Sequence, residues 1–446
     1  GSIDQSKQGM ANLALGMAYL KNAQLHRELH QAAVTASQDY LKKLAAAKQA
    51  RSRFVYFYLG DVLLETEKPG VAATYLEKFA GSAGVDPRYR AMAKACLGLS
   101  YYRNHESQKA QELWAGIDAS DPEVKAELAA VYSKAGLAGK NPASMADESL
   151  AAAKRSGKPL SMRMIKNIMA VYVRTEQTEK GLDLLKRTDM KAYSYQETLG
   201  KSKVINFYDL SLLGDMATLY GKASILYLEK AVLDPKTRDA AEFYLAQAHA
   251  LFGSIEKSSK VATVFVSSSQ MPQPYKDRMR VWQGAGLYQK NHVTTEVVNV
   301  WDELSRKKPE DPDLLAEVLF NCSRLKIECA KIVQKSATVA DAGGGKKLAN
   351  LNIAIGKYYL GKLDNGRAVS YLEAGRDKSN KNKIESNDPA MLVNLADAYY
   401  RTKKYSEALE IFFEMSKQFP EVRQIQEAMQ GVYAVEHKSA GDVKIN

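Results

Sequence analysis

Cysteine is scarce in this chain, which holds three in 446 residues. So few cysteines exclude a scaffold built on disulfides. Cys96 stands alone in an apolar helical pattern, which is typical of a small buried residue. Cys322 and Cys329 lie seven residues apart, and a metal site there would need two further ligands. Across the turn of a helix pair they could form one disulfide in an oxidising compartment or stay as two thiols in a reducing one. The sequence leaves both open.

Long hydrophobic runs are missing as well. The longest candidates, such as 261–266, are far shorter than the ~20 residues of a membrane span, so the sequence predicts no transmembrane segment. Hydrophobic residues make up 46% of the chain and charged residues 26%, which is typical of a folded protein. The opening Gly1-Ser2 is interpreted as a cloning remnant in place of the native start.

Positive charge is in excess, with 63 lysines and arginines against 51 acidic residues and a net charge of +12. This excess permits anionic partners such as nucleic acid, an acidic protein or a lipid surface, without choosing among them. The mild basic clusters at 305–309 and 378–383 are interpreted as solvated surface.

The chain is rich in one recurring pattern of small, aromatic and proline residues. Its two clearest copies are Gly98, Tyr101, Ala110, Trp114 and Pro122, and Ala396, Tyr399, Ala408, Phe412 and Pro420. Searching in the same register places repeats near 9–42, 53–86, 91–124, 162–195, 204–237, 239–272, 278–311, 349–382 and 389–422.

The spacing has a physical reason. Two antiparallel helices approach closely only where both side chains are small, which predicts that Gly98 and Ala110, and likewise Ala408, lie at helix crossings. Large side chains fill the space beside each crossing. The proline is expected to stop the second helix before the next repeat.

This pattern resembles the tetratricopeptide repeat, a 34-residue helix pair. The resemblance implies an all-α fold, a right-handed α-α superhelical solenoid of about eleven helix pairs whose first helices line a concave groove. We expect N-terminal repeats in 1–124, a degenerate or irregular helical unit in 125–161, and central repeats in 162–311. A second degenerate unit in 312–348 and C-terminal repeats in 349–446 follow, closed by a capping helix over 423–438.

Groove positions in this register mix basic, polar and aromatic side chains. The candidates for partner binding are Tyr102, Arg103, Arg163, Lys166, Asn167, Arg174, Trp282, Gln289, Lys357, Asn394, Asp397, Tyr400 and Arg401. The same register adds Phe57, Asp61, Ala95, Leu99, Phe243 and Gln247. An amphipathic or acidic peptide could set its charges on the basic group and its apolar side chains on the aromatics. Solvated surface is the alternative for the charged positions, and packing between repeats is the alternative for Trp282.

Two short motifs could carry chemistry, and both fit their requirements poorly. In "HRELH" (26–30), His26 and His30 share a helical face, but Arg27 stands where a zinc protease has its glutamate, and no third ligand is evident. In "DAGGGKKLAN" (341–350), Ala340 and Lys347 replace the first glycine and the Ser/Thr of a phosphate loop, so a linker is favoured.

We therefore expect a non-enzymatic scaffold, without cofactor or metal, that binds a protein or peptide partner. Lys166 and Asn167 are similar to the pair with which some tetratricopeptide domains hold chaperone tails, but Ala170 stands where the pairing asparagine belongs. RNA binding is the alternative; the groove lacks a repeated polar pair for reading bases, which makes nucleic acid the weaker choice. Residues 11–21 resemble repeats of bacterial envelope proteins in pilus, motility or export assemblies, which implies a periplasmic or outer-membrane-associated location.

Overall fold

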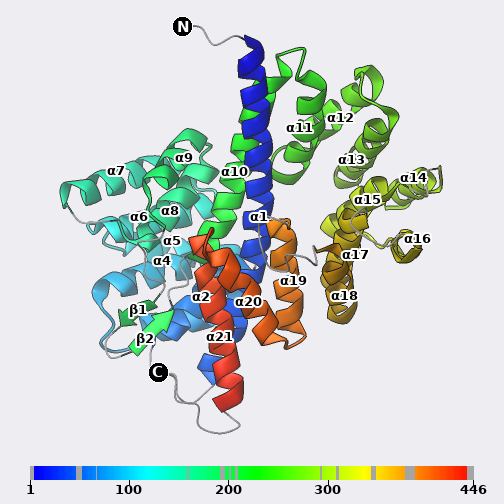
Figure 1. Cartoon of the computed structure of the whole chain (residues 1–446). Coiled ribbons are helices and arrows are strands. Elements are labelled where there is room, and N and C mark those ends of the chain that lie inside the picture. Colours follow the sequence, from blue (N-terminus) through cyan, green and yellow to red (C-terminus); the bar gives the residue numbers. More distant parts are fainter. Residues whose placement is uncertain are drawn as a thin grey trace. The chain divides into compact units, whose positions relative to one another are not determined.

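The fold is known from a computed structural model, shown in Figure 1. The structure describes residues 5–46, 53–66, 68–157, 160–190, 196–199, 202–205, 209–291, 294–307, 311–342, 348–376 and 387–438. These residues are mainly α-helical and divide into two compact units. Unit 1 comprises 1–28 and 220–414, and unit 2 comprises 29–219 and 415–446. Among the described residues, no helix is both long and apolar enough to cross a membrane.

Unit 2 is built from helix hairpins. Its elements are α2 (Phe54–Glu65), α3 (Pro69–Ala80), α4 (Pro87–Arg103), α5 (Ser107–Ala115), α6 (Pro122–Lys134), η1 (Ala138–Lys140), α7 (Pro142–Arg155), α8 (Met162–Arg174), α9 (Thr178–Arg187), η4 (Pro420–Val422) and α21 (Arg423–Lys438). The hairpins are α2–α3, α4–α5, α6–α7 and α8–α9, each formed by a first helix and the second helix that follows it. The first helices α2, α4, α6 and α8 also pack each on the next, which makes the row continuous.

Unit 1 repeats this plan. Its helices are α11 (Arg238–Phe252), α12 (Ile255–Ser268), α13 (Gln273–Asn291), α14 (Thr294–Lys307), α15 (Pro312–Leu325), α16 (Ala330–Ala342), α17 (Ala349–Gly361), α18 (Asn365–Gly375), α19 (Pro389–Arg401) and α20 (Tyr405–Ser416). The first helices here are α11, α13, α15, α17 and α19, and each again packs on the next. The predicted all-α helical-repeat fold is therefore confirmed.

Close helix crossings hold the hairpins together where the sequence pattern predicts them. A Cβ atom on Gly98 would lie 2.1 Å from Nε1 of Trp114, and one on Gly60 would lie 2.5 Å from Leu76. Ala110 and Ala408 are completely buried. The Trp114 indole also donates a hydrogen bond to a backbone carbonyl of the partner helix, 3.0 Å away at Ala95. The small residues are thus needed because a large side chain of the second helix occupies the crossing.

The proline of the pattern plays a different part from the one expected. Helix α5 ends at Ala115, and Pro122 is the first residue of α6. Asp121 caps that helix, since its carboxylate accepts the amide of Glu123 at 2.8 Å. The same Asp-Pro start opens α4, α15 and α19. Proline suits this position because the first helical amide needs no partner within the helix.

Two expected repeats are not helix pairs. Residues 9–42 lie within α1 (Gln5–Ala46), and most of 204–237 lies within α10 (Asp209–Val232), each an unbroken helix. Gly16 meets Leu228 of α10, 2.6 Å from its Cβ position, and Ser224 donates a hydrogen bond to the Gly16 carbonyl at 2.8 Å. The repeat signature was genuine but marks a crossing between α1 and α10. Neither helix holds a proline that would break it, and Pro235 follows the end of α10.

The segments without a signature are ordinary in structure. Residues 125–161 carry α6 and α7, and 312–348 carry α15 and α16, each a helix pair. The division of the chain into five segments stays a prediction. A feature that we did not anticipate is a two-stranded antiparallel ribbon, in which β1 (Gln196–Leu199) pairs with β2 (Ser202–Ile205) so that Gln196 faces Ile205.

Candidate partner-binding surface

Four of the candidate groove residues lie on α8 in unit 2. Arg163, Lys166 and Asn167 are nearly inaccessible, with 2%, 1% and 1% of their surface exposed, and Arg174 is partly exposed at the end of the helix. The register therefore placed them on the inner side of a first helix. Burial of so many charged groups requires partners, because an unpaired charge in the interior is costly.

Glu127 of α6 supplies the partner for two of them. The Arg163 guanidinium forms an ion pair with its carboxylate, and the Asn167 amide donates a hydrogen bond to the same group at 2.9 Å. The Arg163 guanidinium also lies over the Phe57 ring, 4.4 Å from its centroid. Burial and the neighbouring Glu127 raise the pKa of the Cys96 thiol well above its usual value, so this free cysteine is an inert structural residue.

Further ion pairs tie α8 to α2 and α10, and α6 to α2. They are Lys166–Asp61 at 3.1 Å, Lys134–Glu65 at 2.7 Å and Arg174–Asp215 at 2.8 Å. Burial alone would raise the pKa of Glu65, but the adjacent Lys134 lowers it to about 2. The pKa of Asp61 is likewise lowered, against the effect of burial, by Lys166, Arg163 and Lys134. Together with Arg163 and Glu127, these pairs make eight charged side chains, four of each sign, which we call the unit 2 network.

The candidates in unit 1 have other surroundings. Trp282 is 2% exposed and packs in a core with Met279, while its indole N–H donates to the Glu317 carboxylate. The structure therefore agrees with the packing interpretation of Trp282. Lys357 of α17 forms an ion pair with Glu28 of α1 at 3.3 Å. Gln289 has a buried side-chain oxygen with no hydrogen-bond donor in the part of the chain that the structure describes.

The remaining candidates contact their own helix or its neighbour. Arg103 donates to the Leu64 carbonyl at 2.7 Å, and Tyr102 lies 6.0 Å from the Trp114 ring. Along α19 the contacts are Asn394 to the Ala390 carbonyl at 2.6 Å, Arg401 to Asp397 at 3.0 Å and Tyr400 to Tyr405 at 5.6 Å between rings. Arg103 and Arg401 keep part of their surface exposed. Partner binding by these residues stays a prediction.

Sequence reasoning passed over two arginines of unit 1. Arg324 of α15 donates to the Ala250 carbonyl at 3.2 Å and to the Asn321 side-chain oxygen at 3.0 Å, and it lies 5.6 Å from the centre of the Trp282 ring. Burial lowers the pKa of Arg324 to about 10, and the charge of Arg27 lowers it further in the same direction. Arg324 was missed because 312–348 lacks the repeat signature, and Arg27 because it was weighed only within "HRELH".

The short motifs of the sequence are placed as follows. His26 hydrogen-bonds to the Asn22 carbonyl at 2.7 Å and packs on the Tyr220 ring, whereas His30 lies beside Gly214. Within the described ranges, no group of three histidine, cysteine or acidic side chains is arranged to hold a metal. The glycines of 343–345 lie outside the described residues.

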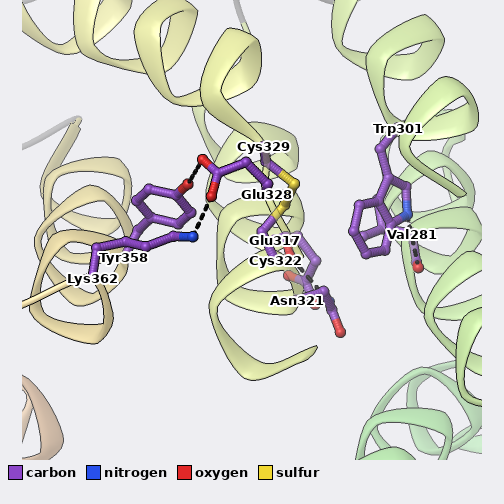
Figure 2. Close-up of a disulfide and its surroundings, with 9 residues drawn as sticks. All are labelled: Val281, Trp301, Glu317, Asn321, Cys322, Glu328, Cys329, Tyr358 and Lys362. Carbon is purple, nitrogen blue, oxygen red and sulfur yellow. Dashed lines mark hydrogen bonds and ion pairs between the residues drawn. A yellow bond between two sulfur atoms is a disulfide. The ribbon is translucent and has the colours of Figure 1, made fainter. Parts of the chain in front are cut away.

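A disulfide closes the turn between α15 and α16 (Figure 2). It joins Cys322 to Cys329, with Cα atoms 6.3 Å apart. Glu328, next to the bridge, accepts a hydrogen bond from the Tyr358 hydroxyl at 2.9 Å and forms an ion pair with Lys362. Figure 2 shows both contacts reaching from the bridged turn to α17. Of the two alternatives left open by the sequence, the structure has the bridge.

Comparison with known proteins gives structural likeness only. No family model matches the chain, and no curated protein matches it. One similar solved structure is the "APC/C hetero-tetramer Cut9-Hcn1", with 11% identity and a TM-score of 0.30 over 85% of this chain and 76% of that one. Another is the "P58(IPK) TPR Domain", with 13% identity and a TM-score of 0.21 over 78% of this chain and 98% of that one.

The packing of the hairpins themselves carries the assignment. Small residues of the first helix lie against large residues of the second at Gly60, Gly98 and Gly356, and the first helices stack in a row. These are the features that define the 34-residue helix-pair repeat. The fold is thus an all-α helical repeat whose hairpins pack as those of the tetratricopeptide repeat do.

Proposed function

We propose that this protein is a non-enzymatic scaffold that binds a protein or peptide partner along its first helices. The observation that carries the proposal is the continuous row α11, α13, α15, α17 and α19, in which each helix packs on the next. Such a row presents an extended surface without a central core, and repeat proteins use such surfaces to hold extended or helical partners.

Unit 1 is the better candidate for the partner. In unit 2 several charged side chains of the first helices form ion pairs with one another, as in Lys166–Asp61 and Arg163–Glu127. In unit 1, Arg324 of α15 has no acidic partner among the described residues, and Gln289 of α13 has a side-chain oxygen without a hydrogen-bond donor there. Polar groups left in this state on partly exposed side chains favour recognition of a polar ligand.

Cross-linked capture with the intact chain tests this proposal. A lysine-reactive reagent should join the captured protein to Lys276 of α13 or Lys357 of α17, which lie on first helices. Lys260 of α12 and Lys331 of α16 lie on second helices and serve as controls. Cross-links confined to the controls would contradict the proposal. So would recovery of material that nuclease treatment abolishes, since that would favour the RNA-binding alternative.

We also propose that the scaffold works in the bacterial envelope, in an assembly such as a pilus, motility or export machine. Two observations support this: the Cys322–Cys329 bridge suits an oxidising compartment, and residues 11–21 resemble repeats of envelope proteins. Fractionation of the native host with alkylation at lysis is the test. Recovery in the cytoplasmic fraction with both thiols alkylated would contradict the envelope location.

A further inference from the structure

The positive side chains along the first helices of unit 1 are not all neutralised. Arg278 forms an ion pair with Glu317 at 2.9 Å, and Lys357 forms one with Glu28 at 3.3 Å. The acidic side chains near Arg324 and Arg27 in the sequence are already engaged: Glu317 by Arg278, Glu328 by Lys362 and Glu28 by Lys357. Among the described residues, Arg27 and Arg324 have no acidic partner within ion-pair distance.

Arg324 is held in place by neutral groups. Its two hydrogen bonds go to the Ala250 carbonyl and the Asn321 amide oxygen, and its guanidinium lies over the Trp282 ring. Its Nε–H group is buried and has no acceptor in the part of the chain that the structure describes. These contacts orient the guanidinium but leave its charge uncompensated, which is unusual for a largely buried arginine.

Arg27 adds a second charge. It lies on α1 next to Glu28, whose ion pair with Lys357 at 3.3 Å places this part of α1 against α17, and α17 packs on α15, which carries Arg324. Burial lowers the pKa of Arg324, and the charge of Arg27 lowers it further. Both arginines keep part of their side chain exposed, so a ligand can reach them. A negative group bound beside them would stabilise both positive charges.

We propose that Arg27 and Arg324 form a binding site for carboxylate side chains of an acidic peptide segment in the partner. Carboxylates fit because the planar guanidinium presents paired N–H donors at their spacing. A peptide is favoured over a small free anion because Arg324 lies on α15, in the row of first helices, along which neighbouring residues of an extended segment can lie. This inference rests on the scaffold function proposed above and names the chemistry of its partner.

Fluorescence anisotropy with a labelled ten-residue glutamate peptide, at low salt, tests the site on the intact chain. A glutamine peptide of the same length is the ligand control. Arg324→Gln and Arg27→Gln should each weaken binding of the glutamate peptide by about 10-fold, as expected for loss of a charge-assisted contact. The matched control is Arg306→Gln, which removes the same charge from an exposed pair with Asp302 on α14 and should change affinity by less than about 2-fold.

Two further measurements separate binding from folding. Peptide binding should change the tryptophan emission, and Trp282→Phe should abolish most of that change, because the Arg324 guanidinium lies over this ring. Arg324→Met should leave the melting temperature unchanged or raise it, since it removes a buried charge that lacks a carboxylate. A marked drop in melting temperature would show that Arg324 is a structural residue and would overturn the proposal.

The remaining outcomes are equally decisive. If all three glutamine variants weaken peptide binding equally, the peptide is attracted by net charge alone and the proposed site is contradicted. Complete displacement of the peptide by millimolar inorganic phosphate would indicate a site for small anions instead of a peptide. If cross-linked capture of a protein partner persists in the Arg27→Gln, Arg324→Gln double variant, this inference fails while the scaffold function stands.

Discussion

At the residue scale, the unit 2 network depends on pairing between buried charges. Lys166 is 1% exposed, and its partner Asp61 is held 3.1 Å away. Removing one member of such a pair leaves the other charge buried without compensation, which costs far more than the pair contributes. Breaking one pair of the network therefore lowers the free energy of unfolding by more than the intact pair adds to it.

Lys166→Met should lower the free energy of unfolding by about 3 kcal/mol. The double variant with Asp61→Asn should recover part of this loss because no charge is then left unpaired. Lys307→Met is the control: its pair with Glu303 is exposed, with 68% and 60% of the two side chains accessible, and should matter by less than about 0.5 kcal/mol. Urea unfolding of the three variants measures the effect. Equal values for Lys166→Met and Lys307→Met would contradict the buried network.

The carboxylates of the network also predict a response to acid. The pKa of Glu65 is about 2 in the folded chain against an ordinary value of 4.5, so its contribution to stability is complete above pH 4.5. That contribution is lost as the pH falls from 4.5 towards 2, because the unfolded chain takes up the proton first. Melting temperatures across this range should therefore fall less steeply in Glu65→Gln than in the parent chain. Parallel curves for the two would contradict the assigned pairing with Lys134.

At the element scale, the helix crossings are the sensitive points of the hairpins. Gly98→Ala should destabilise by about 1–3 kcal/mol, because the new methyl group would lie 2.1 Å from the Trp114 indole. Gly366→Ala is the matched control: it lies in α18 with nothing within 4 Å, and should be neutral or stabilising. Ala110→Leu and Ala408→Leu should be destabilising for the same reason as Gly98→Ala. Thermal unfolding of all four variants tests the crossing register, and unchanged curves for the three crossing variants would remove it.

The bridged turn between α15 and α16 gives a second prediction for an element. Titration of thiols in the denatured, unreduced chain should find one, Cys96, and three after reduction. Cys322→Ser with Cys329→Ser should lower stability by about 2 kcal/mol, through the greater freedom of the opened loop in the unfolded chain. Three reactive thiols before reduction would contradict the bridge.

Elements were predictable where the local sequence decides them. The small residues at crossings, such as Gly98 and Ala408, were found because their spacing reflects contact within one hairpin. The long helix α1 was not, because the signature at Gly16 is the same whether the facing helix is the next one along the chain or α10, two hundred residues away. A sequence pattern records how closely two helices approach but not which helices they are.

At the scale of the whole molecule, the candidate site shows the same limit. The register correctly placed Arg163, Lys166 and Asn167 on a first helix, yet their burial follows from acidic partners on other helices. Asp61 precedes Lys166 by 105 residues, so no local pattern could report that pair. Arg324, conversely, stands out because it has no acidic partner among the described residues. Only the folded arrangement reveals this.

Hydrogen exchange of the intact chain, with and without the glutamate peptide, tests most directly whether unit 1 carries the ligand surface and unit 2 a closed interior. We predict slower exchange on peptide binding in 20–30, 273–291 and 312–325, which contain Arg27, α13 and α15. The amides of α2, α6 and α8 should exchange equally slowly in both samples because their inner side chains are already paired. Protection confined to α2, α6 and α8, with no change around Arg27 and Arg324, would contradict the account.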